Sequence, residues 1–304
     1  MRGAVVTIGT YDGVHLGHQA ILEQVSRSAR ETGAERVACI FPIPPRRSIH
    51  PTPSPHLILP LALRKKLLSE YVDRIELLDF TALRDLQPRE FVEEVLIERL
   101  NVGTVVVGSS FRFAKDRAGT VETLTQLGPE LGFEAQGLPP VYVGQEPVSS
   151  TRIRRQIGDG HVEDAAQLLG RPPLLVGRVV RGKGVGRTLG FPTANLDVHP
   201  HILLPADGVY AAHAFWGRER VHALLYVGRR PTLGGEDRLC EVHVLTDRDI
   251  DLYSHTMEIH VRSFLREDRR FASLEALSTQ IRSDVEHARA ARVKHPLRTD
   301  PISG

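Results

Sequence analysis

The sequence predicts two domains, an α/β domain built on a parallel sheet and, after it, an antiparallel β-barrel with a C-terminal helix. Three observations lead to this fold class. Short apolar runs alternate with helix-period segments in the first half, and strand-like runs separated by turn residues replace them in the second half. The chain of 304 residues also has room for two cores, at roughly 150 residues per domain. The boundary is placed at the Gly-Arg-Pro-Pro stretch, giving domains at residues 1–170 and 171–304.

The first forty residues predict a strand, a helix and a second strand. Residues 4–8 form an apolar run flanked by glycines, which is typical of a buried parallel strand. A helix that ends near Gly33 is expected next, because apolar residues recur at helical spacing, namely Ile21, Val25 and Ala29. Residues 37–41 form the second apolar run. This order favours a right-handed crossover between parallel strands.

The remainder of the first domain continues the alternation after a loop. Seven prolines between Pro42 and Pro60 disfavour regular structure there, since proline lacks an amide donor and restricts the residue before it. The pattern then predicts strands and helices in turn. The expected strands are residues 75–78 and 102–107, and the expected helices are residues 88–100, 121–131, 151–158 and 162–169.

The second domain predicts short strands and one clear helix. The expected strands are residues 175–181, 208–215, 221–227, 240–245 and 257–264. The helix is expected over residues 273–289, because one of its faces is apolar, with Leu274, Leu277, Ile281 and Val285. Several short strands with turn residues between them indicate an antiparallel barrel.

Composition excludes several classes of function. Hydrophobic residues make up 41% and charged residues 25%, which is ordinary for a globular protein, and the net charge of +2 offers no strong field for nucleic acid or an anionic membrane. The two cysteines, Cys39 and Cys240, lie far apart, which argues against a disulfide framework. No apolar run approaches the roughly 18 residues of a membrane helix, and Met1 leads directly into a strand. A cytoplasmic protein is expected.

The first chemical motif follows the first strand. Residues 9–18 read Gly-Thr-Tyr-Asp-Gly-Val-His-Leu-Gly-His, and the helix is expected to start near His18. A helix N-terminus presents unpaired amides, and the glycines let a phosphate approach the backbone. His15 and His18 can then contact the phosphates of a nucleotide. The alternative is that two of the 14 histidines fall together by chance, but the strand–turn–helix setting favours binding.

The second motif lies in the barrel domain, at residues 177–195. Three glycines permit a loop whose amides can surround a phosphate, at Gly182, Gly184 and Gly186. Lys183 and Arg187 add positive charge, and Thr193 with Asn195 supplies oxygen ligands suited to Mg²⁺. The alternative is a hairpin with solvated basic residues. The continuous Gly-Phe-Pro-Thr-Ala-Asn run at residues 190–195 argues against it.

These motifs resemble those of two enzyme families. Residues 9–18 resemble the nucleotidylyltransferase signature in its FAD synthetase form, and residues 177–195 resemble the riboflavin kinase signature. The second likeness continues at residues 204–210, 230–232, 241–243 and 251–253. The chain is thus similar to the bifunctional riboflavin kinase/FAD synthetase family. The resemblance implies a Rossmann-like domain and a six-stranded Greek-key barrel. It also implies ATP-dependent conversion of riboflavin to FMN and of FMN to FAD, with Mg²⁺ as cofactor and pyrophosphate released in the second step.

For the first domain, the resemblance implies that His15 and His18 stabilise charge at the α-phosphate of ATP during adenylyl transfer. Nucleotide or phosphate contacts are implied at Gly9, Asp12, Gly17, Ser150, Thr151 and Arg154, and flavin contacts at Phe111, Arg112 and Phe113. An alternative for the segment after Val148 is a helix N-cap at Ser150 or Thr151 with a solvated Arg154.

For the second domain, the resemblance implies that Thr193 and Asn195 bind Mg²⁺ with ATP and that Glu241 is the base for the ribityl hydroxyl. Phosphate contacts are implied at Gly182, Lys183, Gly184 and Gly186. Phosphoryl transfer needs alignment, a metal at the phosphate oxygens and one carboxylate to receive the proton, so these residue types suit it. The alternative for Glu241 is a surface strand position, which is the usual place for glutamate.

Five positions depart from the family pattern. In the first domain these are Pro44, Ser110, Ala114 and Pro147, and in the second domain Tyr226 replaces an asparagine. A proline neither donates a hydrogen bond nor carries charge, so FAD synthesis is expected to lag behind FMN synthesis unless Arg46 and Arg47 compensate. The alternative is a monofunctional kinase whose first domain is an impaired adenylyltransferase or a non-catalytic nucleotide or flavin sensor. The expected partners are riboflavin, FMN and ATP, with no nucleic acid and no membrane, and a weak homo-oligomer is left open.

Overall fold

A computed structural model describes residues 3–43, 56–182, 186, 190–232, 235–248, 250–290 and 302, with backbone alone at 230–232 and 235–237. The chain folds into two compact units. The sheet unit consists of Met1–Pro55 and Pro60–Ser149, and the barrel unit consists of His56–Leu59 and Ser150–Gly304.

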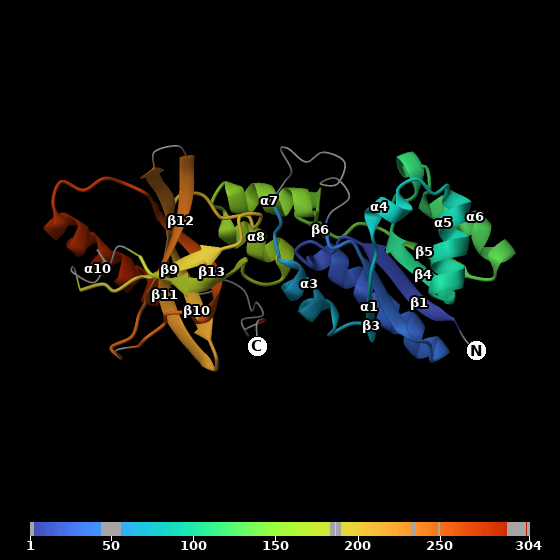
Figure 1. Cartoon of the computed structure of the whole chain (residues 1–304), viewed down its shortest axis with the longest axis horizontal. Coiled ribbons are helices and arrows are strands. Elements are labelled where there is room, and N and C mark those ends of the chain that lie inside the picture. The colour runs from blue at the N-terminus through green and yellow to red at the C-terminus, as the bar shows by residue number, and fades with distance from the viewer. Residues whose placement is uncertain are drawn as a thin grey trace. The chain divides into compact units, whose positions relative to one another are not determined.

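The sheet unit contains a five-stranded parallel sheet (Figure 1). Its strands are β1 (Ala4–Gly9), β2 (Arg36–Ile40), β3 (Arg74–Leu77), β4 (Val102–Gly108) and β5 (Glu134–Leu138). The spatial order is β3-β2-β1-β4-β5, so the chain runs outward from β1 to one edge and then continues from β4 to the other. In such sheets ligands bind where the order reverses, outside the carboxyl ends of the strands. The predicted parallel α/β fold is confirmed, and β5 is an addition to it.

Helices cover both faces of this sheet. They are α1 (Leu16–Thr32), α3 (Leu61–Leu68), α4 (Phe80–Leu83), α5 (Pro88–Phe91), the π-helix η1 (Val92–Arg99), the short 3₁₀ turn η2 (Lys115–Arg117) and α6 (Val121–Leu131). Val6 and Ile8 of β1 pack in one apolar cluster with side chains of α5, η1 and α6. Successive strand residues face opposite sides, so Val5 and Thr7 face the side on which α1 contacts β1, β2 and β4.

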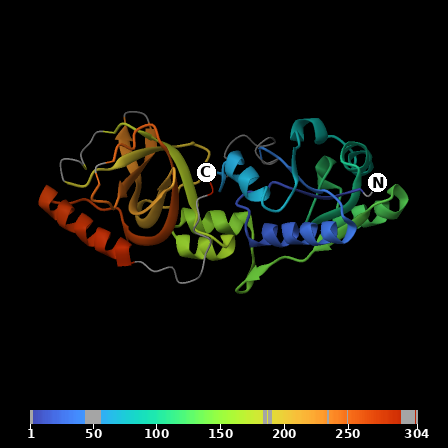
Figure 2. The same cartoon turned by 90° about the horizontal axis from the view of Figure 1, so that it is seen from below.

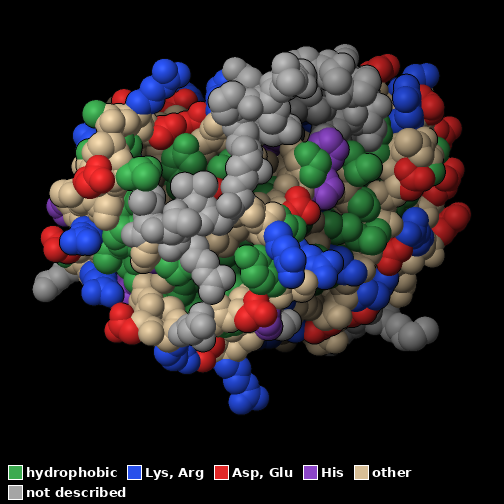
Figure 3. Space-filling model, turned by 60° about the vertical axis from the view of Figure 1, so that its left-hand side comes forward, with side chains coloured by type: hydrophobic (Ala, Val, Ile, Leu, Met, Phe, Trp, Pro, Cys, Tyr) green, Lys and Arg blue, Asp and Glu red, His purple; other side chains and the backbone are tan. Residues whose placement is uncertain are grey.

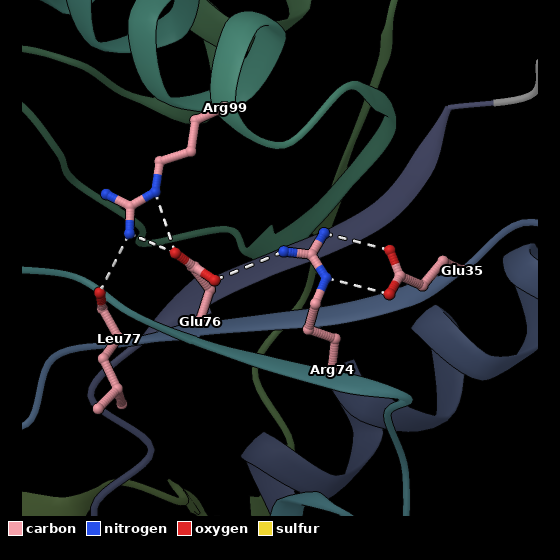
Figure 4. Close-up of polar contacts among 5 residues, drawn as sticks. All are labelled: Glu35, Arg74, Glu76, Leu77 and Arg99. Carbon is pink, nitrogen blue, oxygen red and sulfur yellow. Dashed lines mark hydrogen bonds and ion pairs between the residues drawn. The ribbon is translucent and has the colours of Figure 1, made fainter.

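Charged side chains line the edge strand β3 (Figure 4). Arg74 Nε lies 3.0 Å from Glu35 Oε1, and Arg74 Nη1 lies 3.5 Å from Glu76 Oε2. Glu76 also pairs with Arg99 of η1. These pairs are partly exposed, so each contributes little to stability, but charges on an edge strand discourage pairing with another sheet.

The barrel unit contains six antiparallel strands that close on themselves. They are β8 (Leu174–Val180), β9 (Ala194–Val198), β10 (Gly208–Trp216), β11 (Glu219–Thr232), β12 (Gly235–Val244) and β13 (Thr256–Glu267), in the order β10-β11-β12-β9-β8-β13. Alternate residues of each strand fill the interior, such as Ala223, Leu225 and Val227 of β11. The predicted barrel is confirmed, with β9 as the strand that its pattern did not reveal.

Helices α7 (Ser150–Gly158), α8 (Val162–Leu169) and α10 (Leu274–Ala290) accompany the strands in the described part of the barrel unit. Helix α10 runs along the outside of the barrel and contacts β10, β11 and β13 (Figure 2). Helices α7 and α8 precede β8, and Val162 belongs to the barrel core. The compact units therefore divide at Ser150 along the chain, while a functional boundary at Gly170 stays a prediction. Within the described ranges, no helix is both long enough and apolar enough to cross a bilayer.

Candidate active sites

The turn between β1 and α1 carries the first motif. Tyr11, Gly13 and Val14 all have positive φ, so the chain reverses tightly before the helix begins at Leu16. His15 is the N-cap of α1, and its Nδ1 accepts a hydrogen bond from the amide of His18 at 3.3 Å. The helix thus starts two residues earlier than expected, and the first histidine has a structural role at its N-terminus.

The two histidines lie face to face. Their ring centroids are 3.6 Å apart with an interplanar angle of 16°, and the ring of Tyr11 lies 4.8 Å from that of His18. A Cβ at Gly17 would lie 3.2 Å from the His15 ring, so glycine leaves room for this stack. Asp12 is buried in the same turn, and Gly9 ends β1. The structure therefore brings together the sequence-predicted residues of this motif.

Two features of this turn bear on its chemistry. The hydroxyls of Tyr11 and Thr7 are hydrogen-bonded at 2.6 Å, and burial raises the pKa of Tyr11, so its phenol stays neutral at physiological pH. His15 is buried and His18 is half-buried, and histidine and hydrophobic side chains lie beside one another at the surface of the molecule (Figure 3). A helix N-terminus flanked by two imidazoles is suited to bind an anion such as phosphate.

A cavity of 720 Å³ lies in the sheet unit beyond β4. Phe111 and Phe113 line it with stacked rings 5.7 Å apart, and Arg112, the third predicted residue of this segment, also faces it. The other aromatic walls are Phe41, Phe80 and Phe91. Phe91 lies 5.1 Å from Phe113, and Phe41 lies 6.2 Å from Phe80. Such walls suit a flat aromatic group, because rings favour offset or edge contacts.

The rim of this cavity is charged and its backbone is strained. Basic and acidic side chains line it together, namely Arg84, Lys115 and Arg117 with Asp85 and Asp116. Ala114 has φ 63° and ψ −172°, a combination that is almost confined to glycine. Asp116 and Arg117 also have positive φ. The position that departs from the family glycine therefore adopts a conformation that glycine would favour.

The remaining predicted residues of the first domain are separated between the two units. Ser150 begins α7, and the Nε of Arg154 donates to the carbonyl of His56 at 2.8 Å, all within the barrel unit. Their grouping with His15 and His18 stays a prediction.

Pro147 pairs with Tyr142 in a two-stranded ribbon, β6 (Tyr142–Val143) and β7 (Glu146–Pro147). Ser110 lies in the exposed turn after β4, whereas Pro44, Arg46 and Arg47 lie outside the described residues.

The second candidate site lies on the outer face of the barrel. Asn195 of β9 pairs directly with Glu241 of β12, and Glu241 pairs with Tyr226 of β11. The residues beside each of these three belong to the barrel core, so the three side chains face outward by the alternation of strands. Thr193 Oγ1 donates a long hydrogen bond of 3.5 Å to Glu241 Oε2. The structure thus groups the three sequence-predicted residues Thr193, Asn195 and Glu241.

Two glycines of the second motif lie against this group. A Cβ at Gly182 would lie 2.0 Å from Asn195 Nδ2, and a Cβ at Gly186 would lie 2.4 Å from the carbonyl oxygen of Phe191. The Phe191 amide donates to the Gly186 carbonyl at 2.8 Å. Glycine at these positions therefore permits the close approach of the loop. Lys183, Gly184 and Arg187 lie outside the described residues.

Side chains around Glu241 fix the neighbouring segments. His243 Nδ1 donates to the Pro192 carbonyl at 2.8 Å, and burial lowers the pKa of His243, which favours its neutral form. The Tyr226 hydroxyl donates to Asp268 at 3.2 Å, and burial, together with Asp268, raises the pKa of Tyr226 to about 12. A neutral phenol thus occupies the strand position beside Glu241.

The donor set of this site suits a hard cation bound together with a substrate. No cluster of three or more histidine, cysteine or carboxylate residues suitable for a metal occurs in the part of the chain that the structure describes. The outer face instead offers the hydroxyl of Thr193, the amide of Asn195 and the carboxylate of Glu241. Mg²⁺ accepts few protein oxygens and completes its shell with phosphates and water, so this set fits it.

Sequence reasoning missed part of both sites. Phe41, Phe80 and Phe91 line the cavity from three separate parts of the chain. Of these, only Phe41 stands where the sequence pattern could have indicated a ligand site, since it ends the apolar run predicted as a strand. Tyr226 was noted as a departure, but its pairing with Asp268 required the fold. Arg64 of α3 was not singled out, although it is fully buried beside the first motif.

Comparison with known proteins matches each half of the chain to a family model. Residues 1–152 match the model described as FAD synthetase, and residues 169–292 match the model described as riboflavin kinase. These ranges contain the first and second motifs, respectively.

Two sequence relatives and one solved structure are similar to this chain over almost its whole length. A bifunctional riboflavin kinase/FMN adenylyltransferase of Pseudomonas fluorescens is 38% identical over 294 residues, covering 95% of this chain and 93% of the relative. The protein of the same name from Escherichia coli K12 is 33% identical over 291 residues, covering 95% and 92%. A crystal structure titled as a macrolide-efflux protein from Streptococcus pneumoniae superposes with a TM-score of 0.87 at 33% identity, covering 96% of this chain and 95% of that one.

Proposed function

Since the chain belongs to the family of bifunctional riboflavin kinase/FMN adenylyltransferases, we propose that it performs both reactions and that each unit contributes a separate set of reacting groups. The barrel unit transfers the γ-phosphate of ATP to riboflavin, giving FMN. The groups of the sheet unit support transfer of AMP from a second ATP to FMN, giving FAD and pyrophosphate. The observation that carries this proposal is the presence of two distinct phosphate-suited sites, each inside the segment that matches the corresponding family model.

In the kinase reaction, Glu241 is the base. Its carboxylate accepts the proton of the ribityl 5′-hydroxyl while that oxygen attacks the γ-phosphate. Support comes from its place between Asn195 on the neighbouring strand and Thr193 Oγ1 at 3.5 Å. Strands β9 and β11 pair with β12 on either side of Glu241, so the backbone of this residue is held within the ladder. Amides of the loop at Gly182, Lys183, Gly184 and Gly186 contact the phosphates of ATP.

Mg²⁺ is the cofactor that this donor set fits. Thr193 and Asn195 would bind it through their side-chain oxygens, together with the phosphates of ATP. When bound, the ion neutralises charge on the phosphate oxygens during transfer. The lack of a side chain at Gly182 leaves room for this amide, because a Cβ there would lie 2.0 Å from Asn195 Nδ2.

In the adenylyl transfer, His15 and His18 stabilise the charge that develops at the α-phosphate of ATP. Support comes from their position at the N-terminus of α1 and from their stacked rings. Gly9, Asp12 and Gly17 shape the turn that admits the phosphates, whereas phosphate contacts at Ser150, Thr151 and Arg154 stay a prediction from the sequence. FMN supplies the attacking phosphate, and no covalent enzyme intermediate is required.

The phenylalanine-lined cavity takes the isoalloxazine ring of FMN. Phe111 and Phe113 provide stacked aromatic surface, and Arg112 at the rim provides positive charge for the flavin phosphate. The cavity is lined by Ile8 of β1, by Phe41 directly after β2 and by Phe111 to Phe113 after β4, so it lies at the carboxyl ends of these strands. Its position agrees with the rule that places ligands at that point of an open sheet.

The protein is proposed to act in the cytoplasm on riboflavin, FMN and ATP, without nucleic acid and without a membrane. Both cysteines are buried free thiols, which suits a reducing compartment. A weak homo-oligomer is compatible with this proposal, and light scattering at two protein concentrations measures it.

A chromatographic time course of riboflavin, FMN and FAD in the presence of ATP and Mg²⁺ tests the proposal. We expect FMN to form first and to accumulate, because Ala114 strains the cavity rim and Pro147 lacks a donor, so that FAD synthesis is the slower step. FMN without FAD would leave a monofunctional kinase. The absence of both products would refute the proposal.

A further inference from the structure

Arg64 is a fully buried cation in the sheet unit, although it belongs to a run of three basic residues in α3. Its side chain is 0% exposed, whereas the next two residues, Lys65 and Lys66, are exposed. The buried guanidinium donates to three backbone carbonyls. Nη1 lies 2.7 Å from Thr10 O and 3.1 Å from Phe41 O, and Nη2 lies 2.5 Å from Pro42 O.

The three carbonyls belong to the two parts of the proposed adenylyl-transfer site. Thr10 lies in the turn that carries His15 and His18, whereas Phe41 lines the aromatic cavity and Pro42 follows it. The strands before them, β1 and β2, are neighbours in the sheet, with Gly9 opposite Ile40. Arg64 therefore spans the carboxyl ends of both strands and ties the phosphate-binding turn to a wall of the flavin cavity.

The choice of arginine follows from this geometry. A guanidinium is planar and presents several donors in fixed directions, so one side chain can satisfy carbonyls on two chain segments. Burial lowers the pKa of Arg64, and the nearby buried Asp12 acts in the opposite direction. Arginine starts from a pKa above 12, so it remains charged despite this burial, while a lysine at the same place would offer one compact charge.

Resting on the proposed adenylyl transfer, we propose that Arg64 is a positioning residue that sets the distance between the bound FMN and the phosphates of ATP. It does not touch either substrate, since its side chain is fully buried. It acts through Thr10, which leads into the histidine turn, and through Phe41, which contacts the flavin. A displacement of about 1 Å between reacting groups can lower a rate by roughly 100-fold, so loss of this brace affects turnover more than binding.

The test compares Arg64→Met and Arg64→Lys with Arg89→Met as the matched control. Arg89 also forms several polar contacts in the sheet unit, with Glu93 and Glu130 on the surface, but it lies outside both parts of the site. The measurements are kcat for FAD formation, the dissociation constant of FMN from fluorescence, and the kinase rate in the same preparation.

We expect Arg64→Met to lower kcat for FAD formation by about 100-fold and to change the FMN dissociation constant by less than about threefold. Arg64→Lys should restore part of kcat, since an ammonium still donates to some of the carbonyls, and Arg89→Met should match the wild type. The kinase rate should be unchanged in all three. A loss of FMN binding in proportion to kcat would show a merely structural role and overturn the inference, as would wild-type turnover in Arg64→Met.

Two further outcomes keep the inference separate from the function on which it rests. If Arg64→Met does not fold, Arg64→Lys alone decides: a lowered kcat with unchanged FMN affinity supports positioning, and wild-type kcat overturns it. If the wild-type protein binds FMN but forms no FAD, the proposed adenylyl transfer fails, and the inference fails with it. If the wild type forms FAD and both Arg64 variants do so at the same rate, only the inference fails.

Discussion

The two units position their reacting groups by different physical means. In the sheet unit, the histidine motif follows β1, and Phe111, Arg112 and Phe113 follow β4. In the barrel unit, Asn195 and Glu241 lie within the strand ladder itself and pair directly. Turns are shaped by local backbone conformation, whereas ladder positions are determined by register across strands.

The two units also differ in how many of their described non-glycine residues have a strained backbone with positive φ. Among the described non-glycine residues, most of those with positive φ belong to the sheet unit and surround its proposed site, namely Tyr11, Val14, Ala114, Asp116 and Arg117. In the described part of the barrel unit, Ser254 has such a φ, and it lies between β12 and β13. Strained residues persist only where surrounding contacts fix them. The sheet unit therefore depends on bracing contacts, and the barrel unit depends on strand pairing.

The largest expected effect tests the barrel side of this comparison. Glu241→Gln removes the base while keeping the shape of the side chain, so FMN formation should fall by about 1,000-fold. FAD formation from supplied FMN should be unchanged, because the histidine turn belongs to the other unit. Product chromatography measures both. Wild-type FMN formation in this variant would refute the role of Glu241.

The next effect tests the sheet side. His18→Ala removes one of two groups that stabilise charge at the α-phosphate, so FAD formation should fall by about 100-fold while FMN formation is retained. His161→Ala, at the N-cap of α8 in the barrel unit, is the matched control and should leave both rates unchanged. If both rates fell together in His18→Ala, the separation of the two sites would be wrong.

A pair of fragments tests where the barrel unit begins. Val162 of α8 is part of the barrel core, so a fragment of residues 150–304 should be more stable than one of residues 171–304 by about 2 kcal/mol, the burial of one such side chain. Urea unfolding measures the difference, and both fragments should phosphorylate riboflavin if they fold. Equal stabilities would show that α7 and α8 do not belong energetically to the barrel.

A smaller effect tests the strain at the cavity rim. Ala114→Gly should stabilise the sheet unit by about 1 kcal/mol, because glycine adopts φ 63° and ψ −172° without the steric cost that alanine has there. Ala118→Gly is the matched control in the same loop, at an ordinary φ of −68°, and should be slightly destabilising. The midpoint of denaturant unfolding measures both. Destabilisation by Ala114→Gly would mean that the conformation is not strained.

The smallest effect concerns pH and the barrel alone. Burial, followed by the charges of Arg262 and Arg220, lowers the pKa of His213 from about 6.5 to about 3, with smaller contributions from His222 and His260. The unfolded chain therefore takes up a proton first as the pH falls below 6.5, and stability is lost from there downward toward 3. His213→Gln cannot titrate, so its urea midpoint should fall less between pH 7 and pH 5. An equal fall in both proteins would contradict the assignment.

Much of the fold was predictable because the spacing of apolar residues along the sequence indicates which residues are buried. Residues 4–8 and 102–107 form apolar runs, and both proved to be central strands of the parallel sheet. Strand β9 was missed because polar Asn195 and charged Asp197 alternate with its apolar residues over only five positions. Helix α3 was missed because it follows directly on the proline-rich segment, with Pro60 as its N-cap.

The candidate sites were predictable only where the motif is contiguous in sequence. The histidine turn could be identified because one strand–turn–helix segment carries all of its groups. The cavity could not, since its phenylalanines are contributed by separate elements that only the sheet topology brings together. Arg64 gave no signal at all, because a residue next to Lys65 and Lys66 is usually part of a solvated helix face.

The most direct test of two separate sites is complementation between the two single variants. Glu241→Gln and His18→Ala are each incubated with riboflavin, ATP and Mg²⁺, alone and as an equimolar mixture, and FAD is measured over time. Each variant alone should form FAD at a small fraction of the wild-type rate, the first for lack of FMN and the second for lack of adenylyl transfer. The mixture should restore FAD formation, because FMN released by one variant is a substrate for the other. A mixture no more active than its components would contradict the division of the two reactions between the barrel face and the histidine turn.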